Sequence, residues 1–66
     1  MANVRLWEIR TEKGLKLEAV AAMTGVSKST LNNIENGKTS PTLDTLEKIA
    51  KGLGCHMNEL YDSEYK

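Results

Sequence analysis

The sequence predicts an all-α protein in which five short helices surround one core. Apolar residues recur at helical spacing in successive short segments, and glycine or proline separates these segments. No segment shows the alternation of apolar and polar residues that marks a half-buried strand. The chain has 66 residues and one cysteine, so we expect helix packing, and not disulfides, to stabilise it.

The first two helices are predicted over residues 4–13 and 17–24. In the first, Leu6 and Ile9 face inward, and Arg10 lies beside them, where a charge needs a carboxylate partner. The inward stripe of the second helix consists of Leu17, Val20, Ala21 and Thr24. A short break then leads to the third helix, so the two helices must cross steeply, as in a helix-turn-helix.

The third helix is predicted between Ser27 and Gly37. Ser27 is a good N-cap because its hydroxyl can accept a backbone N–H, and Gly37 suits the left-handed end of a helix. Leu31 and Ile34 share the inward face. The opposite face carries a lysine, a hydroxyl and three amides, namely Lys28, Ser29, Asn32, Asn33 and Asn36. Because such groups can hydrogen-bond to base edges, this helix is the candidate reader of a DNA groove.

A fourth helix is expected after Pro41, with Thr42 as its N-cap. Its inward stripe consists of Leu43, Leu46, Ile49, Ala50 and Leu53. A fifth short helix over residues 57–61 completes the core. We therefore expect one domain over residues 5–60, followed by a short tail over residues 61–66 that has little to bury.

Charge is balanced overall but distributed unevenly along the chain. The chain has nine basic and nine acidic residues, and this balance argues mildly against a nucleic-acid partner, since proteins that bind nucleic acid are usually basic. Residues 1–40 carry six basic and four acidic residues, a net charge of +2, whereas residues 41–66 carry three and five, a net charge of −2. This polarity can orient the N-terminal part of the chain towards phosphate.

Other functions find little support. No apolar run approaches the ~18 residues that span a membrane, and no secretory signal is present, so we expect a cytoplasmic protein with no membrane association. Cys55 and His56 supply too few ligands for a metal site and are interpreted as a small core residue beside a surface imidazole. The chain offers no plausible nucleophile and base, so we expect no enzyme activity, no cofactor and no small-molecule ligand.

Several motifs occur together between residues 5 and 60. They are L-x-x-I-R at 6–10, K-G-L at 13–15, T-G-V-S-K-S-T-L at 24–31, I-E-N-G-K at 34–38, S-P-T-L at 40–43 and L-x-K-I-A-K-x-L-G at 46–54. In this combination they resemble the phage repressor/Cro-type (xenobiotic-response-element-like) helix-turn-helix family. The resemblance implies a five-helix repressor-like DNA-binding domain, in which the second and third helices form the helix-turn-helix.

The resemblance also implies roles for individual residues. Base contacts fall on Lys28, Ser29, Asn32 and Asn33. Phosphate contacts fall on Lys16, Leu17, Asn36, Lys38, Thr39 and Ser40. A buried salt bridge joins Arg10 to Glu35. Removing either partner of that bridge would strand a charge at a cost of ~3–5 kcal/mol.

Two positions depart from the family pattern. Many members begin the second helix with Thr-Gln, whose glutamine binds phosphate, whereas this chain has Lys16 and Leu17. The leucine side chain cannot donate a hydrogen bond, although the backbone amides at the helix start still can. His56 stands where a serine or another capping residue is usual before the last helix.

The primary hypothesis is a sequence-specific transcriptional regulator, a repressor, that binds a near-palindromic operator in double-stranded DNA as a homodimer. One helix reads too few base pairs for high specificity, so two copies would address half-sites ~34 Å apart. The rival hypothesis is a protein-binding module of the same fold, such as the antitoxin of a toxin–antitoxin pair, which the zero net charge fits better. Trp7, Tyr61 and Tyr65 either pack the terminal segments together or contribute to a dimer seam.

Overall fold

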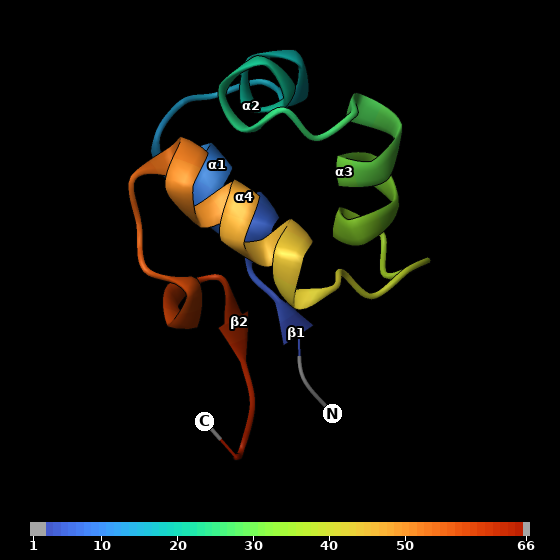
Figure 1. The fold of residues 1–66 in the computed structure, drawn as a ribbon, viewed down its shortest axis with the longest axis vertical. Coiled ribbons are helices and arrows are strands. Elements are labelled where there is room, and N and C mark those ends of the chain that lie inside the picture. The colour runs from blue at the N-terminus through green and yellow to red at the C-terminus, as the bar shows by residue number, and fades with distance from the viewer. Residues whose placement is uncertain (1–2, 66) are drawn as a thin grey trace.

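The computed structural model describes residues 3–65, which contain four α-helices, one short 3-10 helix and one small sheet. In chain order the elements are β1 (Asn3–Val4), α1 (Leu6–Glu12), α2 (Leu17–Thr24), α3 (Lys28–Glu35), α4 (Leu43–Leu53), η1 (Met57–Glu59) and β2 (Tyr61–Asp62). In Figure 1, α4 crosses in front of α1, α2 lies above both, α3 lies to one side, and β1 and β2 lie at the lower end. No helix within residues 3–65 is both long and apolar enough to cross a membrane.

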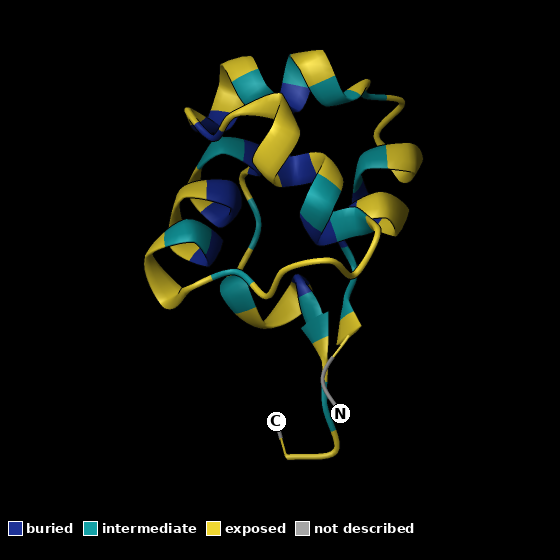
Figure 2. Ribbon diagram, turned by 90° about the vertical axis from the view of Figure 1, so that its right-hand side faces the viewer, coloured by how far each residue is buried: buried dark blue, intermediate teal, exposed yellow. Residues whose placement is uncertain are grey.

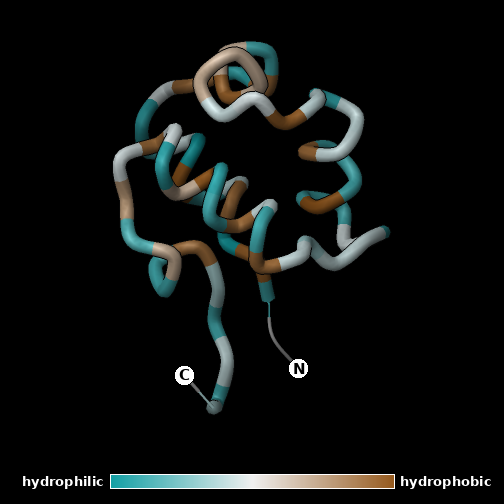
Figure 3. The backbone as a smooth tube through the Cα atoms, in the orientation of Figure 1, coloured by the Kyte–Doolittle hydropathy of each residue, from teal (hydrophilic) through white to brown (hydrophobic). Residues whose placement is uncertain are grey.

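The core receives one fully buried side chain from each of five segments. These side chains are Leu6 of α1, Val20 of α2, Leu31 of α3, Ile49 of α4 and Leu60 after η1. Figure 2 shows that the helices turn their buried sides towards one another, and Figure 3 shows the apolar positions of α3 on its inner side. Because these helices are too short to be stable alone in water, burial of this shared core is what maintains them.

The predicted capping residues begin α3 and α4. The Ser27 hydroxyl accepts the backbone N–H of Thr30 at 3.2 Å, and the Thr42 hydroxyl accepts that of Thr45 at 3.1 Å. As expected for the end of a helix, Gly37 follows α3 with a φ of 72°. Each cap contributes ~1 kcal/mol and fixes the residue at which its helix begins.

The ends of the chain differ from the sequence prediction. The expected fifth helix over residues 57–61 is a single 3-10 turn, η1, and the expected first helix begins at Leu6 because Val4 belongs to a strand. Antiparallel β1 and β2 pair Asn3 with Asp62 and Val4 with Tyr61. Strands of two residues are too short to show a sequence alternation, so the prediction of no strand was wrong.

The predicted tail and one predicted core residue also differ. Tyr61 and Asp62, which begin the segment 61–66, form β2 and pair with the N-terminal segment, while Lys66 lies outside the described residues. Leu43, assigned to the inward stripe of α4, is 75% exposed. It is the first residue of that helix and lines an open hollow beside Val4 and Met57, so no segment within residues 3–65 covers it.

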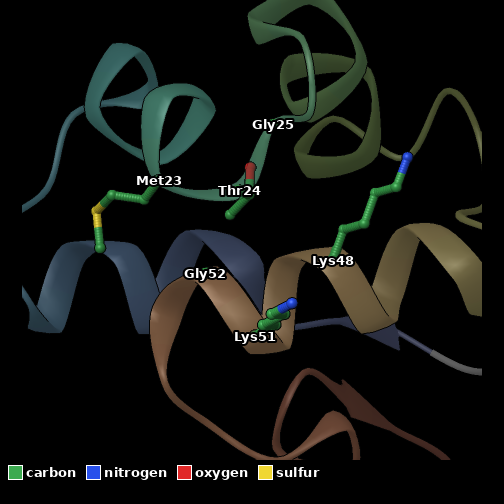
Figure 4. A pocket seen from close by; sticks show the side chains of 6 residues that line it. All are labelled: Met23, Thr24, Gly25, Lys48, Lys51 and Gly52. Carbon is green, nitrogen blue, oxygen red and sulfur yellow. The ribbon is translucent and has the colours of Figure 1, made fainter.

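Helices α2 and α4 meet at a glycine. A Cβ built on Gly52 would lie 2.6 Å from the Met23 carbonyl oxygen and 2.6 Å from Thr24 Cγ2. Figure 4 shows the Thr24 side chain directed towards α4 at this point. The glycine therefore lets the end of α2 approach α4 closely, and this contact places the turn that leads into α3.

Candidate nucleic-acid interface

The outward face of α3 carries the residues predicted to contact bases. Lys28, Ser29 and Asn32 are exposed and Asn33 is half-buried, while Leu31 and Ile34 of the same helix belong to the core. The helix therefore separates a polar outer face from an apolar inner one. Lysine, serine and asparagine side chains on one exposed face can offer donors and acceptors to a groove of DNA.

The turn between α2 and α3 is stabilised by a buried threonine. Thr24 Oγ1 donates to the Val20 carbonyl at 2.8 Å and accepts the backbone N–H of Val26 at 3.2 Å. Gly25 adopts a left-handed φ of 75°, and the side chain of Val26 is buried. Thr24 was predicted on the inward stripe of α2, but these hydrogen bonds were not predicted from the sequence. A β-branched hydroxyl residue directly before glycine was the available signal.

An ion pair connects the C-terminal end of α3 to α1. Arg10 Nε and Nη2 donate to the two Glu35 carboxylate oxygens at 2.7 and 3.0 Å, and Nη1 donates to the Leu15 carbonyl at 3.0 Å. The side chains are only 17% and 6% exposed. Hydrogen bonding to Glu35 raises the pKa of Arg10. The structure thus contains the pair that the resemblance implied, and its two-point geometry fixes the orientation of α3.

A second ion pair, which sequence analysis did not identify, connects the N-terminal end of α3 to α2. Lys28 Nζ lies 2.7 Å from Glu18 Oε1, and the two side chains are 60% and 62% exposed. The hydrogen bond and the positive charge of Lys28 lower the pKa of Glu18. The only signal in the sequence was a pair of opposite charges in the first turns of successive helices.

Two asparagines interact along the outer side of α3. Asn36 Nδ2 donates to Asn32 Oδ1 at 3.2 Å, one helical turn away. This hydrogen bond uses one donor of Asn36 and one of the two lone pairs of Asn32 Oδ1, so that oxygen can accept a second hydrogen bond. The Asn32 amide nitrogen keeps its donors, and the Asn36 side chain keeps its acceptor oxygen.

The residues predicted to contact phosphate flank the two ends of α3. Lys16 is the N-cap residue of α2 and is exposed, and Leu17 is half-buried against the core. The Glu18–Lys28 pair brings this end of α2 beside the start of α3. The other predicted residues follow the last turn of α3 and are exposed, namely Asn36, Lys38, Thr39 and Ser40. In Figure 1 the loop that contains these residues projects from the lower end of α3.

Cys55 and His56 differ in burial. Cys55 packs against the core, where desolvation raises the pKa of its thiol, and His56 is exposed. Among residues 3–65, no three histidine, cysteine, aspartate or glutamate side chains are grouped closely enough to bind a metal ion. The His56 backbone N–H donates to Glu59 Oε2 at 3.2 Å, so the glutamate caps η1.

Similar proteins are regulators. The chain is 42% identical over 65 residues to the cryptic phage CTXphi transcriptional repressor RstR of Vibrio cholerae, covering 97% of this chain and 59% of that protein. It is 36% identical over 67 residues to the transcriptional regulator SinR of Bacillus subtilis, covering 100% and 60%. It is also 36% identical over 58 residues to the regulator DdrOP3 of Deinococcus deserti, covering 88% and 45%. The chain thus spans less than two thirds of each of these relatives.

A solved structure and a family pattern agree with these relatives. A transcriptional regulator of the HTH_3 family from Vibrio cholerae superposes with a TM-score of 0.79 at 49% identity, covering 80% of this chain and 30% of that one. The pattern of the family described as helix-turn-helix matches residues 8–60. The chain therefore belongs to the Cro/repressor-type helix-turn-helix family, HTH_3.

Proposed function

We propose that this chain is the DNA-binding unit of a transcriptional regulator, in which α2 and α3 form the helix-turn-helix and α3 enters the major groove. One observation carries the proposal. The polar outer face of α3 is presented by a helix that is fixed at both ends, through the Thr24 turn and through the Arg10–Glu35 pair. A reader of sequence needs this rigidity, because base contacts depend on the position of each donor and acceptor.

Base recognition falls to four residues of α3. The amides of Asn32 and Asn33 suit adenine, since each offers a donor beside an acceptor, and the Lys28 ammonium suits the O6 and N7 acceptors of guanine. Ser29 can donate or accept and so discriminates little. The sequence preference of the protein then depends chiefly on the two asparagines and the lysine.

Phosphate contacts would fix the register of the helix on the duplex. Lys16 and Lys38 supply charge, and Asn36, Thr39 and Ser40 supply polar side chains near the C-terminal end of α3. Leu17 contributes through its backbone N–H, because the first hydrogen bond within α2 is donated by Val20 to the Lys16 carbonyl at 3.1 Å. The backbone N–H of Leu17 therefore has no partner within the helix and can bind an anion.

We further propose a repressor that binds a near-palindromic operator as a homodimer. A hollow of about 260 Å³ lies beside the loop after α3 and is lined mainly by apolar side chains, namely Val4, Pro41, Leu43, Leu46, Met57 and Tyr61, with Ser40 at its edge. The 75% exposure of Leu43 at this hollow supports a second copy as its cover. Occupying an operator blocks polymerase without further chemistry, and the relative RstR is named a transcriptional repressor.

The test is a binding selection on random duplexes, repeated at several salt concentrations. We expect enrichment of a two-fold motif whose affinity falls steeply with salt, and a mass in solution with DNA that corresponds to two chains. Asn33→Ala should cost ~1–3 kcal/mol and relax one base position of the motif. Uniform weakening on all sequences would make Asn33 a backbone contact, and no enrichment at low salt would overturn the proposal.

The alternative is a protein-binding module, such as an antitoxin. Zero net charge and the exposure of Trp7 at 54% and Tyr65 at 88% favour it. Failure to select any duplex, together with formation of a stable complex that Trp7→Ala abolishes, would support this function over the first.

A further inference from the structure

The lysine proposed to read guanine is already paired in the protein without DNA. Lys28 Nζ and Glu18 Oε1 are 2.7 Å apart, and both side chains are more than half exposed. The pair joins the first turn of α2 to the first turn of α3, so a carboxylate lies on the surface proposed to meet DNA. We propose that Glu18 is a specificity-determining residue, which makes Lys28 a poor phosphate contact while leaving it able to bind guanine.

The Lys28 ammonium attracts phosphate through its charge but binds guanine through directed hydrogen bonds. A phosphate attracts an ammonium group regardless of the neighbouring base, and this attraction supplies most non-specific affinity. A carboxylate 2.7 Å away opposes that attraction. The ammonium has three N–H donors, of which Glu18 occupies one. Two donors remain for the O6 and N7 acceptors of guanine, so the directional contact survives while the charge contact is weakened.

The other lysines proposed at the interface behave differently. In the described part of the chain, Lys16 and Lys38 have no acidic side chain within ion-pair distance, whereas Lys28 does. The unpaired lysines are those assigned to phosphate, and the paired one is assigned to a base. This distribution favours a role for Glu18 in selectivity over one in general attraction.

The carboxylate stays charged under the conditions of DNA binding. The hydrogen bond from Lys28, together with its positive charge, lowers the pKa of Glu18 below the usual range. Since both side chains are exposed, neither must be desolvated to rearrange when DNA arrives. At a guanine the lysine can contact carboxylate and base together. On a duplex without guanine at this position, the Glu18 carboxylate faces the phosphates and weakens the binding of the protein to DNA.

This inference rests on the proposed function, and Glu18→Gln tests it. The variant keeps the size of the side chain and an oxygen acceptor but removes the charge. The matched control is Glu12→Gln, which removes the same charge from an exposed residue beside a hollow that α3 does not line. For wild type and both variants, the dissociation constants are measured on the selected operator and on a scrambled duplex, between low and physiological salt.

We expect Glu18→Gln to bind the scrambled duplex about two- to fivefold more tightly, the range for an exposed ion pair. Its salt slope on that duplex should steepen by about 0.9, the value for one additional phosphate contact. Affinity for the operator should change less, so the specificity ratio falls, while Glu12→Gln leaves the ratio unchanged. In a Lys28→Gln background, Glu18→Gln should leave the specificity ratio unchanged, because the guanine contact that the carboxylate favours is then absent.

The remaining outcomes are distinct. An unchanged or increased specificity ratio in Glu18→Gln, with wild type still selecting an operator, overturns the role of Glu18 and leaves the proposed function intact. An equal effect of Glu12→Gln also overturns it, because net charge alone would then be responsible. Absence of DNA binding by wild type at low salt overturns the proposed function and this inference with it.

Discussion

The two ends of α3 are attached to the rest of the molecule by ion pairs of opposite character. At the C-terminal end, Arg10 and Glu35 form a two-point contact between side chains that are 17% and 6% exposed. At the N-terminal end, Glu18 and Lys28 form a contact between side chains that are 60% and 62% exposed. The shortest distance between nitrogen and oxygen is 2.7 Å in both pairs, so the pairs differ in burial and in the number of contacts, not in distance.

The difference in burial gives the two pairs different tasks. A buried charge that loses its partner has no water to replace it, so breaking the first pair should destabilise the fold. An exposed charge that loses its partner is solvated at once, so the second pair can change partners without unfolding the helix. One end of α3 is therefore suited to hold position, and the other end is suited to respond to a ligand.

The largest expected effect comes from breaking the buried pair. Glu35→Leu should lower the free energy of unfolding by ~3–5 kcal/mol, because it leaves the Arg10 guanidinium buried without a carboxylate. Urea denaturation followed by circular dichroism measures this change. The double variant Arg10→Met with Glu35→Leu should recover most of the loss, since no charge is then stranded. A loss of stability in Glu35→Leu below ~1 kcal/mol would remove the distinction between the two ends.

A smaller effect is expected at the turn before α3. Thr24→Val should cost ~1–3 kcal/mol of unfolding free energy, because the buried Val26 N–H loses its acceptor while the shape of the side chain is kept. Thr24→Ser retains the hydroxyl and serves as the control. The same denaturation experiment compares them. If Thr24→Val unfolds like the wild type while Thr24→Ser is destabilised, the methyl group against α4 matters and the hydrogen bond does not.

The smallest effect on stability is expected at the exposed pair. Glu18→Gln should leave the urea midpoint at pH 7 unchanged, although it alters DNA selectivity. Because Lys28 lowers the pKa of Glu18, any stability the pair adds is present above the ordinary carboxyl value of 4.5 and is lost as pH falls through the lowered value. Denaturation at pH 7 and pH 3 checks this sign. A drop comparable to that of Glu35→Leu would show that exposure does not separate the pairs.

Much of the helical framework could be predicted because local chemistry specifies it. The bounds of α2 were predicted as observed, and hydroxyl caps at Ser27 and Thr42 marked where α3 and α4 begin. A cap and a periodic stripe are read from a few neighbouring residues. The same is true of the outward face of α3, whose exposed residues follow from helical spacing alone.

The rest depends on contacts between distant residues. Arg10 and Glu35 are 25 positions apart, and only the family resemblance indicated their pairing. The Glu18–Lys28 pair arises from the angle between two helices, which no local pattern records. The small sheet forms because the burial of Leu6 and Leu60 draws the two ends of the chain together. The DNA contacts assigned to α3 and to its flanking residues remain predictions.

The pairing of β1 with β2 has a practical consequence for joining this unit to something else. Asn3 and Asp62 are register partners, so the described segments that enter at β1 and leave at β2 lie side by side, at the lower end of Figure 1. A fluorescent tag, a surface linker or another domain can therefore be attached through either end at the same pole. Two such attachments, one before β1 and one after β2, would start from neighbouring strands, and a covalent link joining these strands would close the backbone into a circle without crossing α3.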